Sequence, residues 1–362
     1  MFDLGLLTYP VIGAVAVFAV ALFSGENVVI ERIPVPYQLQ WNGYSSDVAT
    51  RQFTDALRKL NDDAASELTD IEVDPTNLQE GLGAFEDYFS ITILVNGARN
   101  VLGVIPYYVE GEIADVHGQD IMTVRVFTDK ADLPVYVSVT KGDADNIQPM
   151  IQAAAVDTLE HINPYVVCLY YRQTELAAGQ FDFAKTQAAA DRYLASQPLD
   201  KHFLIYGLLG RMHMLKAERD KALTADQKQA EYDEAMKYLK AALLQHDDFL
   251  YPYINIGLIY AGRGQNDLAE KFYARAVEIN PNYLITRTLW GDLLAKEGRW
   301  QDAAIQYVAA VEIDRDNAGL RDKLARAYQA LGRPDAARTQ WQEALRISPL
   351  TPAYANALRD LN

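Results

Sequence analysis

The sequence predicts an α+β chain in three parts: an N-terminal transmembrane helix, a small α+β domain and a C-terminal all-α solenoid. Three observations support this fold class. Residues 4–25 carry no charged side chain, three segments between 107 and 142 alternate between apolar and polar residues, and a 34-residue pattern recurs near the C-terminus. Alternation is typical of strands, whereas the longer pattern contains the apolar spacing of amphipathic helices. The predicted parts are an anchor at 1–25, an α+β domain at 26–162, degenerate helical hairpins at 163–248, and three regular hairpins with a capping helix at 249–362.

Composition fits a large globular portion behind an anchor. The chain has 362 residues, enough for two or three domains, and 50% of them are hydrophobic. The formal net charge of −16 argues against nucleic acid and anionic membrane surfaces as partners, because both require basic patches. The single cysteine, Cys168, permits no internal disulfide.

Residues 4–25 are long enough to span a bilayer, which takes roughly 20 apolar residues in a helix. The alternatives are a cleaved signal peptide and a buried helix of a soluble protein. A signal peptide needs a basic leading region and small residues at its cleavage site, but only Asp3 precedes the run and Phe23 lies at its end. We therefore expect an uncleaved anchor and a single-pass inner-membrane protein. The short leading tail favours a periplasmic location for the residues that follow the span. The count of basic residues near the span gives almost no preference between the two orientations, because Arg32 is the only one.

The middle segment does not repeat, and it predicts helices packed on an antiparallel sheet. Its predicted order is strand, two helices, three strands and helix. The first helix begins with a cap at Ser45 or Ser46 and has apolar residues at Val48, Phe53, Leu57 and Leu60. Turns are expected at 117–118 and 130–132. The predicted elements are a strand at 27–36, helices at 45–68 and 82–103, strands at 107–116, 120–129 and 133–142, and a helix at 146–162.

The repeat is clearest in residues 253–282. Small residues and glycines recur at steps of 34, which indicates paired helices that approach closely around a turn. Glycine at the turn tolerates the left-handed conformation that ends the first helix, and Pro281 lacks the donor needed to extend the second. The recurring sets are Gly257, Gly291 and Ala325; Gly264, Gly298 and Gly332; Ala269, Ala303 and Ala337; Tyr273, Tyr307 and Trp341; Ala276, Ala310 and Ala344; and Pro281, Arg315 and Pro349.

These spacings resemble the tetratricopeptide repeat, a 34-residue helix–turn–helix unit. The units run 250–283, 284–317 and 318–351, and the polar tail from Thr351 predicts a capping helix. Upstream, an insertion around 217–231 is expected to lengthen both helices of one hairpin, and the region around Gly179 reads as a degenerate first unit. The resemblance implies a curved solenoid whose first helices line a concave, protein-binding face.

The middle segment resembles, more loosely, a region of membrane-anchored tetratricopeptide proteins of proteobacteria. The resemblance lies in RIPVP, GYSSDVATRQFTDALRKL, EGEIADV, MTVRVF and AAAVDTLEHINPY. The segment is also broadly similar to the small sheet domains of envelope proteins. Both similarities imply an accessory protein of the envelope and carry no catalytic residues.

No pattern in the sequence predicts a reaction or a cofactor. The five histidines lack metal-ligand spacing, and the chain has neither a phosphate-binding loop nor a nucleophile elbow. We therefore expect a non-enzymatic protein without a cofactor. A divergent enzyme stays open as a third hypothesis, which requires two or more of Glu110, Glu112, Asp115 and His117 to lie in one cleft.

The repeat resemblance implies specific partner-contacting residues, at positions 2, 5, 9, 12 and 13 of each unit. Lys and Asn at positions 5 and 9 would make a carboxylate clamp for acidic peptide tails, and this chain has neither there. The expected surface is apolar at one end and mixed in charge at the other. The candidates are Tyr251, Ile254 and Leu258; Thr288, Asp292 and Lys296; and Asp322, Arg326 and Gln329.

The sequence thus predicts a membrane-anchored scaffold that binds protein partners through its repeats and assembles or stabilises an envelope complex. Homo-oligomerisation is a further expectation, through the solenoid ends or the transmembrane helix. The alternative is a sensory or regulatory module in which the α+β domain binds a ligand and the repeats relay that state. This alternative requires a pocket lined by polar groups within 26–160.

Overall fold

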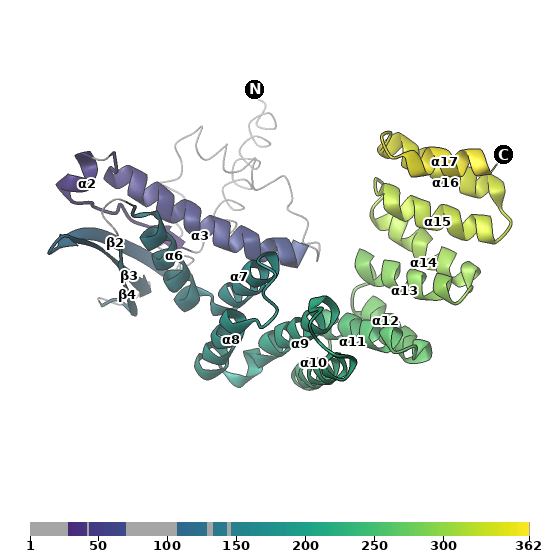
Figure 1. Cartoon of the computed structure of the whole chain (residues 1–362), viewed down its shortest axis with the longest axis horizontal. Coiled ribbons are helices and arrows are strands. Elements are labelled where there is room, and N and C mark those ends of the chain that lie inside the picture. Colours follow the sequence, from purple (N-terminus) through teal and green to yellow (C-terminus); the bar gives the residue numbers. More distant parts are fainter. Residues whose placement is uncertain (1–27, 42, 70–106, 129–132, 143–145, 362) are drawn as a thin grey trace, which may run out of the picture. The chain divides into compact units, whose positions relative to one another are not determined.

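The computed structural model describes residues 28–41, 43–69, 107–128, 133–142 and 146–361 (Figure 1). The chain divides into two compact units, Met1–Gln173 and Thr174–Asn362, and the division falls inside helix α7 (Pro164–Ala177). The predicted anchor at 4–25, the predicted helix at 82–103 and the predicted turn at 130–132 lie outside the described residues. None of the helices within the described ranges is long and apolar enough to cross a bilayer.

The first unit contains a four-stranded sheet in the order β1-β2-β3-β4. The three predicted strands at 107–142 are confirmed, and so is the turn between the first two, where His117 and Gly118 have φ angles of 58° and 80°. The prediction of a wholly antiparallel sheet was wrong, because β1 runs parallel to β2. A long connection containing α3 (Ser46–Thr69) separates these two strands, as parallel neighbours require. The strands are β1 (Val28–Ile30), β2 (Tyr107–Val116), β3 (Gln119–Thr128) and β4 (Tyr136–Lys141).

Helices α3 and α6 (Gln148–Ile162) pack against each other, and α6 also packs on β3 and β4. The predicted cap of α3 is confirmed at Ser45, whose hydroxyl accepts a hydrogen bond from the Val48 amide at 3.2 Å. The buried stripe contains Phe53 and Leu60, as predicted, but Val48 is exposed. Alanines take the remaining core positions, at Ala49, Ala56 and Ala64. A short helix, α2 (Tyr37–Trp41), was not predicted from the sequence.

The second unit is a series of helical hairpins, and from residue 184 onward each helix packs on the next. The predicted insertion is confirmed by two long helices of 18 and 21 residues, α9 and α10, whereas the helices of the regular hairpins have 13 or 14. The helices that follow α7 are α8 (Ala184–Ser196), α9 (His202–Arg219), α10 (Ala225–Gln245), α11 (Leu250–Gly262), α12 (Asn266–Ile279), α13 (Leu284–Lys296), α14 (Trp300–Ile313), α15 (Ala318–Ala330), α16 (Pro334–Ile347) and α17 (Pro352–Asp360), with a single 3₁₀ turn at Leu199–Lys201.

The turn glycines behave as the repeat predicts. Gly264, Gly298 and Gly332 have φ angles of 71°, 77° and 67°, in the left-handed region that side chains avoid. Each of them follows the first helix of its hairpin. In the degenerate hairpin, Gly179 also adopts the left-handed conformation after the first helix, with a φ of 69°.

A second repeating contact ties each regular hairpin to the loop before it. Tyr253 Oη donates to the carbonyl of Asp247 at 2.8 Å, and Arg287 Nε donates to the carbonyl of Pro281 at 2.9 Å. Arg321 Nε donates to the carbonyl of Arg315 at 3.0 Å. Donors and acceptors both recur every 34 residues. The acceptor is a backbone carbonyl, which every residue type has. The contact is therefore also made in the unit where Arg315 stands at the position of Pro281.

The degenerate hairpin of α7 and α8 is held by a buried carboxylate. Phe183 precedes α8 in a left-handed conformation and provides no side-chain cap. Glu175 Oε1 accepts from the Lys185 amide at 2.8 Å, and Glu175 Oε2 accepts from the amide and hydroxyl of Thr186 at 3.1 and 2.6 Å. Glu175 thereby satisfies donors that the first turn of α8 would otherwise leave unpaired, and its charge suits the helix N-terminus.

Candidate protein-binding face

The candidate site is the side of α11, α13 and α15 that carries the nine predicted contact residues, called here the first-helix face. Contacts between hairpins show that these helices are neighbours. Lys323 Nζ of α15 pairs with Asp292 Oδ1 of α13 at 2.6 Å, and the rings of Tyr251 and Tyr283 lie 6.2 Å apart at the start of α11 and α13. Each of these contacts joins one predicted residue, Asp292 or Tyr251, to a residue that was not predicted.

The apolar end of this face is largely used for packing. Ile254 is only 6% exposed, and Leu258 packs against the core cluster that contains Met214 and Leu239. Tyr251 is half-buried, and burial raises its pKa to about 12. The long helices α9 and α10 supply this core, so the apolar residues of α11 leave little open surface.

The two aspartates of the face hold the solenoid together. Asp292 accepts a hydrogen bond from Tyr307 Oη at 2.8 Å and pairs with Lys323. Asp322 Oδ1 accepts from Trp341 Nε1 at 2.8 Å. Burial, together with the neighbouring Asp292 carboxylate, raises the pKa of Tyr307 above its ordinary range. Both carboxylates satisfy polar atoms of buried aromatic rings, which would be costly to leave unpaired.

The open part of the face lies at the C-terminal ends of α13 and α15. Lys296 and Gln329 are exposed, and Lys296 takes part in no hydrogen bond or ion pair within the described part of the chain. Arg326 is exposed and pairs with Asp322 at 2.8 Å along its own helix. Thr288 is half-buried and donates to the Leu284 carbonyl of its own helix at 3.0 Å. The surface available to a partner is thus polar and mixed in charge.

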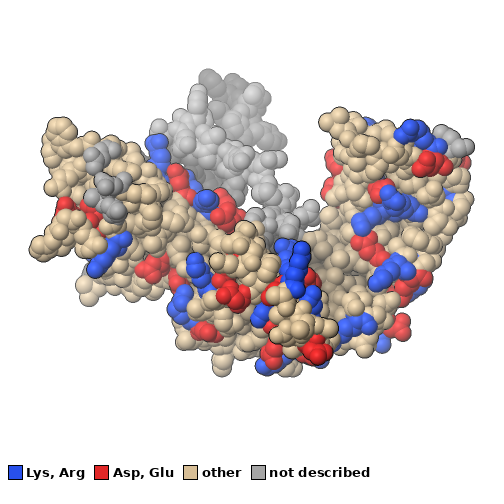
Figure 2. Space-filling model, in the orientation of Figure 1, with Lys and Arg blue, Asp and Glu red and all other residues tan. Residues whose placement is uncertain are grey.

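Sequence reasoning missed a series of polar contacts between successive hairpins. Arg263 pairs with Asp233 at 2.6 Å, Arg299 pairs with Glu270, and Asn266 donates to Glu297 at 2.7 Å. Figure 2 shows the resulting surface, on which Lys and Arg alternate with Asp and Glu. The members of each pair lie 29 to 31 residues apart, so a search for opposite charges at nearly one repeat length would have found the two arginine pairs, although not the contact of the neutral Asn266.

A titratable cluster lies between α9 and α10. Glu231 accepts from His213 Nδ1 and pairs with Lys216 Nζ, each at 2.6 Å, and the His213 ring stacks on Tyr238. Burial acts to raise the pKa of Glu231, but the hydrogen bonds from Lys216 and His213 outweigh it and hold this pKa below its ordinary value.

This shift predicts a pH-dependent contribution to stability. A carboxylate with a depressed folded pKa stabilises the fold above its unfolded pKa, about 4.3 for glutamate, and this stabilisation is lost as pH falls through the folded value. We expect Glu231→Gln to lower the unfolding midpoint at pH 7 and to flatten its decline below pH ~4.5. Urea denaturation followed by circular dichroism at several pH values measures both effects. Glu234→Gln, an exposed site on the same helix, is the control, and an equal pH dependence in Glu231→Gln and wild type would contradict the assignment.

The four residues of the enzyme hypothesis do not converge. Glu110 and Glu112 lie on one face of β2, and Glu112 pairs with Arg125 at 2.7 Å. Asp115 accepts from the Gly118 amide at 2.8 Å in the exposed turn that His117 also occupies. Among the described residues, no group of three His, Cys, Asp or Glu side chains is arranged to hold a metal ion.

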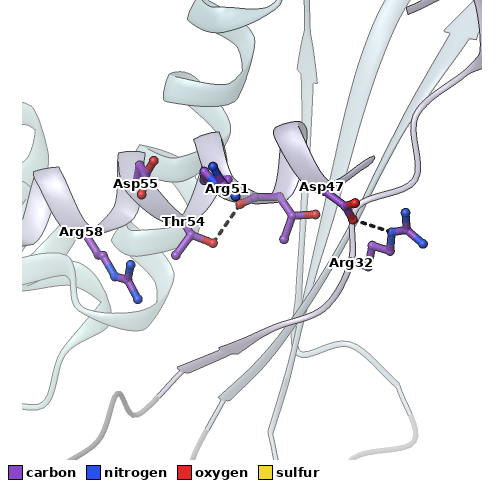
Figure 3. Close-up of a pocket in the computed structure, with 7 residues that line it drawn as sticks. Arg32, Asp47, Arg51, Thr54, Asp55 and Arg58 are labelled. Atoms are coloured by element: carbon purple, nitrogen blue, oxygen red, sulfur yellow. Dashed lines mark hydrogen bonds and ion pairs between the residues drawn. The ribbon is translucent and has the colours of Figure 1, made fainter. Parts of the chain in front are cut away.

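A shallow hollow of about 400 Å³ lies along α3 in the first unit (Figure 3). Four of its lining residues already bond to protein groups: Arg32 pairs with Asp47 at 3.0 Å, and the hydroxyls of Thr50 and Thr54 donate to carbonyls of their own helix. The hollow is open to solvent, and the polar-lined pocket that the sensory alternative requires stays a prediction. The lining residues are Arg32, Asp47, Thr50, Arg51, Thr54, Asp55 and Arg58.

Comparison with known proteins identifies the repeats. The tetratricopeptide repeat profile matches residues 250–283 and 294–361. The Photosystem I assembly protein Ycf3 of Rippkaea orientalis (strain PCC 8801 / RF-1) is 32% identical over 96 residues, which are 24% of this chain and 56% of that protein. Tetratricopeptide repeat protein 6 of Homo sapiens is 28% identical over 129 residues, 35% of this chain and 25% of that protein. The chain thus spans between a quarter and just over half of the length of these relatives.

Solved structures with similar helical arrays cover more of the chain. YrrB, described as a tetratricopeptide repeat protein with an unusual peptide-binding site, aligns with 19% identity and a TM-score of 0.39, over 57% of this chain and 98% of its own. MamA aligns with 17% identity and a TM-score of 0.39, over 49% of this chain and 94% of its own. From the profile matches and the repeating contacts, we conclude that residues 250–361 carry tetratricopeptide repeats, which generally mediate protein–protein interactions and complex assembly.

Proposed function

We propose that this chain is a non-enzymatic, membrane-anchored adaptor that binds a protein partner and supports the assembly or stability of an envelope complex. The observation that carries the proposal is the run of three regular repeats with open polar side chains at Lys296, Arg326 and Gln329. The name of the Ycf3 relative, an assembly protein, supports the assembly role. Residues 4–25 would provide the anchor, in the inner membrane with the remaining chain in the periplasm.

The charge of the repeats indicates the kind of partner. Residues 250–362 contain fourteen Lys and Arg and thirteen Asp and Glu, so this region is nearly neutral within a chain of net charge −16. Most of these charges pair within the solenoid, and the two aspartates of the first-helix face are occupied. We therefore expect a folded protein or an extended segment of mixed charge, rather than an acidic tail that needs a cluster of free cations.

Charge reversal at the open residues tests the proposal. The variant Lys296→Glu/Arg326→Glu is expected to lose a defined set of proteins that the wild-type chain retains when purified from its native membranes in mild detergent. Lys271→Glu, an exposed lysine on the second helix α12, is the matched control and is expected to retain the whole set. Mass spectrometry of the three preparations measures the difference. The same set in all three would remove the first-helix face from the proposal, and a wild-type chain without bound proteins would contradict the adaptor role.

The sensory alternative stays a prediction. The hollow on α3 is open, and its Arg32–Asp47 pair and threonine hydroxyls already bond to protein groups. No arrangement among the described residues of the first unit favours a particular ligand.

A further inference from the structure

Strand β4 forms an edge of the sheet, because within the described strands it pairs only with β3 (Figure 1). The register shows which residues direct their backbone groups outward. The Gly142 amide donates to the Asp120 carbonyl at 2.8 Å, which places the even-numbered residues of β4 in the hydrogen-bonded pairs with β3. Val137, Val139 and Lys141 therefore direct their N–H and C=O groups toward the free edge.

The side chains along this edge are apolar and open. Val137 and Val139 are 47% and 59% exposed, whereas Ser138 between them is 2% exposed and faces the helices. Proteins usually protect an edge strand with proline, with charged side chains such as lysine, or with bulges, and here Pro134 precedes β4 and Lys141 ends it, so that the centre of the strand carries neither. Here the irregularity lies at the end of the strand, where the Val135 amide also donates to the carbonyl of Val126, the register partner of Tyr136. Among the described residues, no strand pairs with the outward backbone groups of the segment from Val137 to Lys141.

We propose that a second copy of this chain pairs with β4 in antiparallel orientation, centred on Val139. This register satisfies all three outward residues of each copy, because Val139 lies opposite its equivalent and Val137 lies opposite Lys141. It brings no like charges together. Residues 133–142 contain no Asp or Glu, so this edge is a place where two chains of net charge −16 can approach without carboxylates facing each other. The contact is self-complementary, as a two-fold dimer requires.

The register predicts that cysteines at positions 139 and 137 differ in their ability to form a disulfide between two copies. Opposed residues of a hydrogen-bonded antiparallel pair have Cα atoms about 5.5 Å apart, within the range of a disulfide. Cysteines at position 139 of the two copies would meet this condition. Position 137 of one copy would lie roughly 14 Å along the strand from position 137 of the other, because four residues separate them at about 3.4 Å each.

The test uses the full chain, whose own Cys168 is buried. Under mild oxidation, Val139→Cys is expected to form a disulfide-linked dimer of twice 40.5 kDa, whereas Val137→Cys, on the same face of the same strand, is expected to remain unlinked. Native mass spectrometry is expected to show that Val139→Lys weakens the dimer of the unlinked chain at least about tenfold, because two ammonium groups would then face each other. Val116→Lys, an exposed valine outside β4, should leave the dimer unchanged.

Three outcomes would overturn the proposal. Val139→Cys could remain monomeric after oxidation, or it could cross-link no more than Val137→Cys, which would exclude the register centred on Val139. Alternatively, Val139→Cys in native membranes could link to a different protein, which would show that the edge receives the strand of another partner. Because the cysteine variants change only one exposed side chain, their result does not depend on whether Val139→Lys folds normally.

Discussion

Replacing Trp341 with alanine is expected to lower the free energy of unfolding of the C-terminal hairpin by about 3–5 kcal/mol. The Trp341 side chain is 1% exposed, and it packs with Ala325 and Ala337 and against α17. Its removal would leave a large cavity that the flanking helices can fill only in part. It would also leave Asp322 without the indole donor. Because each repeat of a solenoid contacts only its neighbours, the loss should be concentrated in α15, α16 and α17.

Urea denaturation followed by circular dichroism measures the loss, since the substitution itself changes tryptophan fluorescence. Trp341→Phe is the matched control, because it keeps an aromatic ring and removes the hydrogen bond to Asp322. We expect it to cost about 1–2 kcal/mol. Equal losses for Trp341→Ala and Trp341→Phe would show that the hydrogen bond, and not the volume of the ring, determines the contribution of this residue.

Gly291→Ala is expected to destabilise the second regular hairpin by about 1–3 kcal/mol, although alanine is the better helix former by about 1 kcal/mol. A Cβ atom at Gly291 would lie 2.5 Å from Cε1 and 2.8 Å from Cδ1 of Tyr307. The Tyr307 ring is buried, so it cannot swing into solvent. Either the ring or the whole of α14 must move away from α13.

Gly262→Ala provides the control, because a Cβ atom there would meet nothing within 4 Å. It is expected to raise the free energy of unfolding by up to about 1 kcal/mol. The third hairpin pairs Ala325 with Trp341 where the second pairs Gly291 with Tyr307. The double variant Gly291→Ala/Tyr307→Trp should therefore recover part of the loss, as coupling between residues in contact requires. A stabilised Gly291→Ala chain, measured by the same denaturation experiment, would contradict the close-packing explanation.

The repeats could be predicted because their rules are local. A glycine that must be left-handed, such as Gly298, and a small residue under a ring, such as Gly291, reveal their role by type and spacing alone. The arginine contacts were missed because Arg287 and Arg321 replace an aromatic residue at an equivalent position and reach a backbone carbonyl, which carries no sequence signal.

The candidate site was predicted only in outline. Repeat positions predicted the nine residues of the first-helix face, and their contact with a partner stays a prediction. They could not show that Asp292 and Asp322 accept hydrogen bonds from Tyr307 and Trp341, because those contacts depend on how the helices of one hairpin stack. Likewise, the repeat position of Ile254 predicts an exposed groove residue. The structure buries it, because the long helices α9 and α10 pack beside α11. In the first unit, alternation predicted the strands, whereas the parallel pairing of β1 depends on a long connection whose path no local pattern specifies.

The adaptor proposal is tested most directly by hydrogen exchange of the full chain with and without a partner purified from its membranes. The proposal predicts slower exchange in the partner complex along the C-terminal ends of α13 and α15, around Lys296 and Arg326, with little change in the second helices α12, α14 and α16. Protection confined to those second helices, or to the unit that contains the sheet, would place the partner elsewhere and contradict the role of the first-helix face.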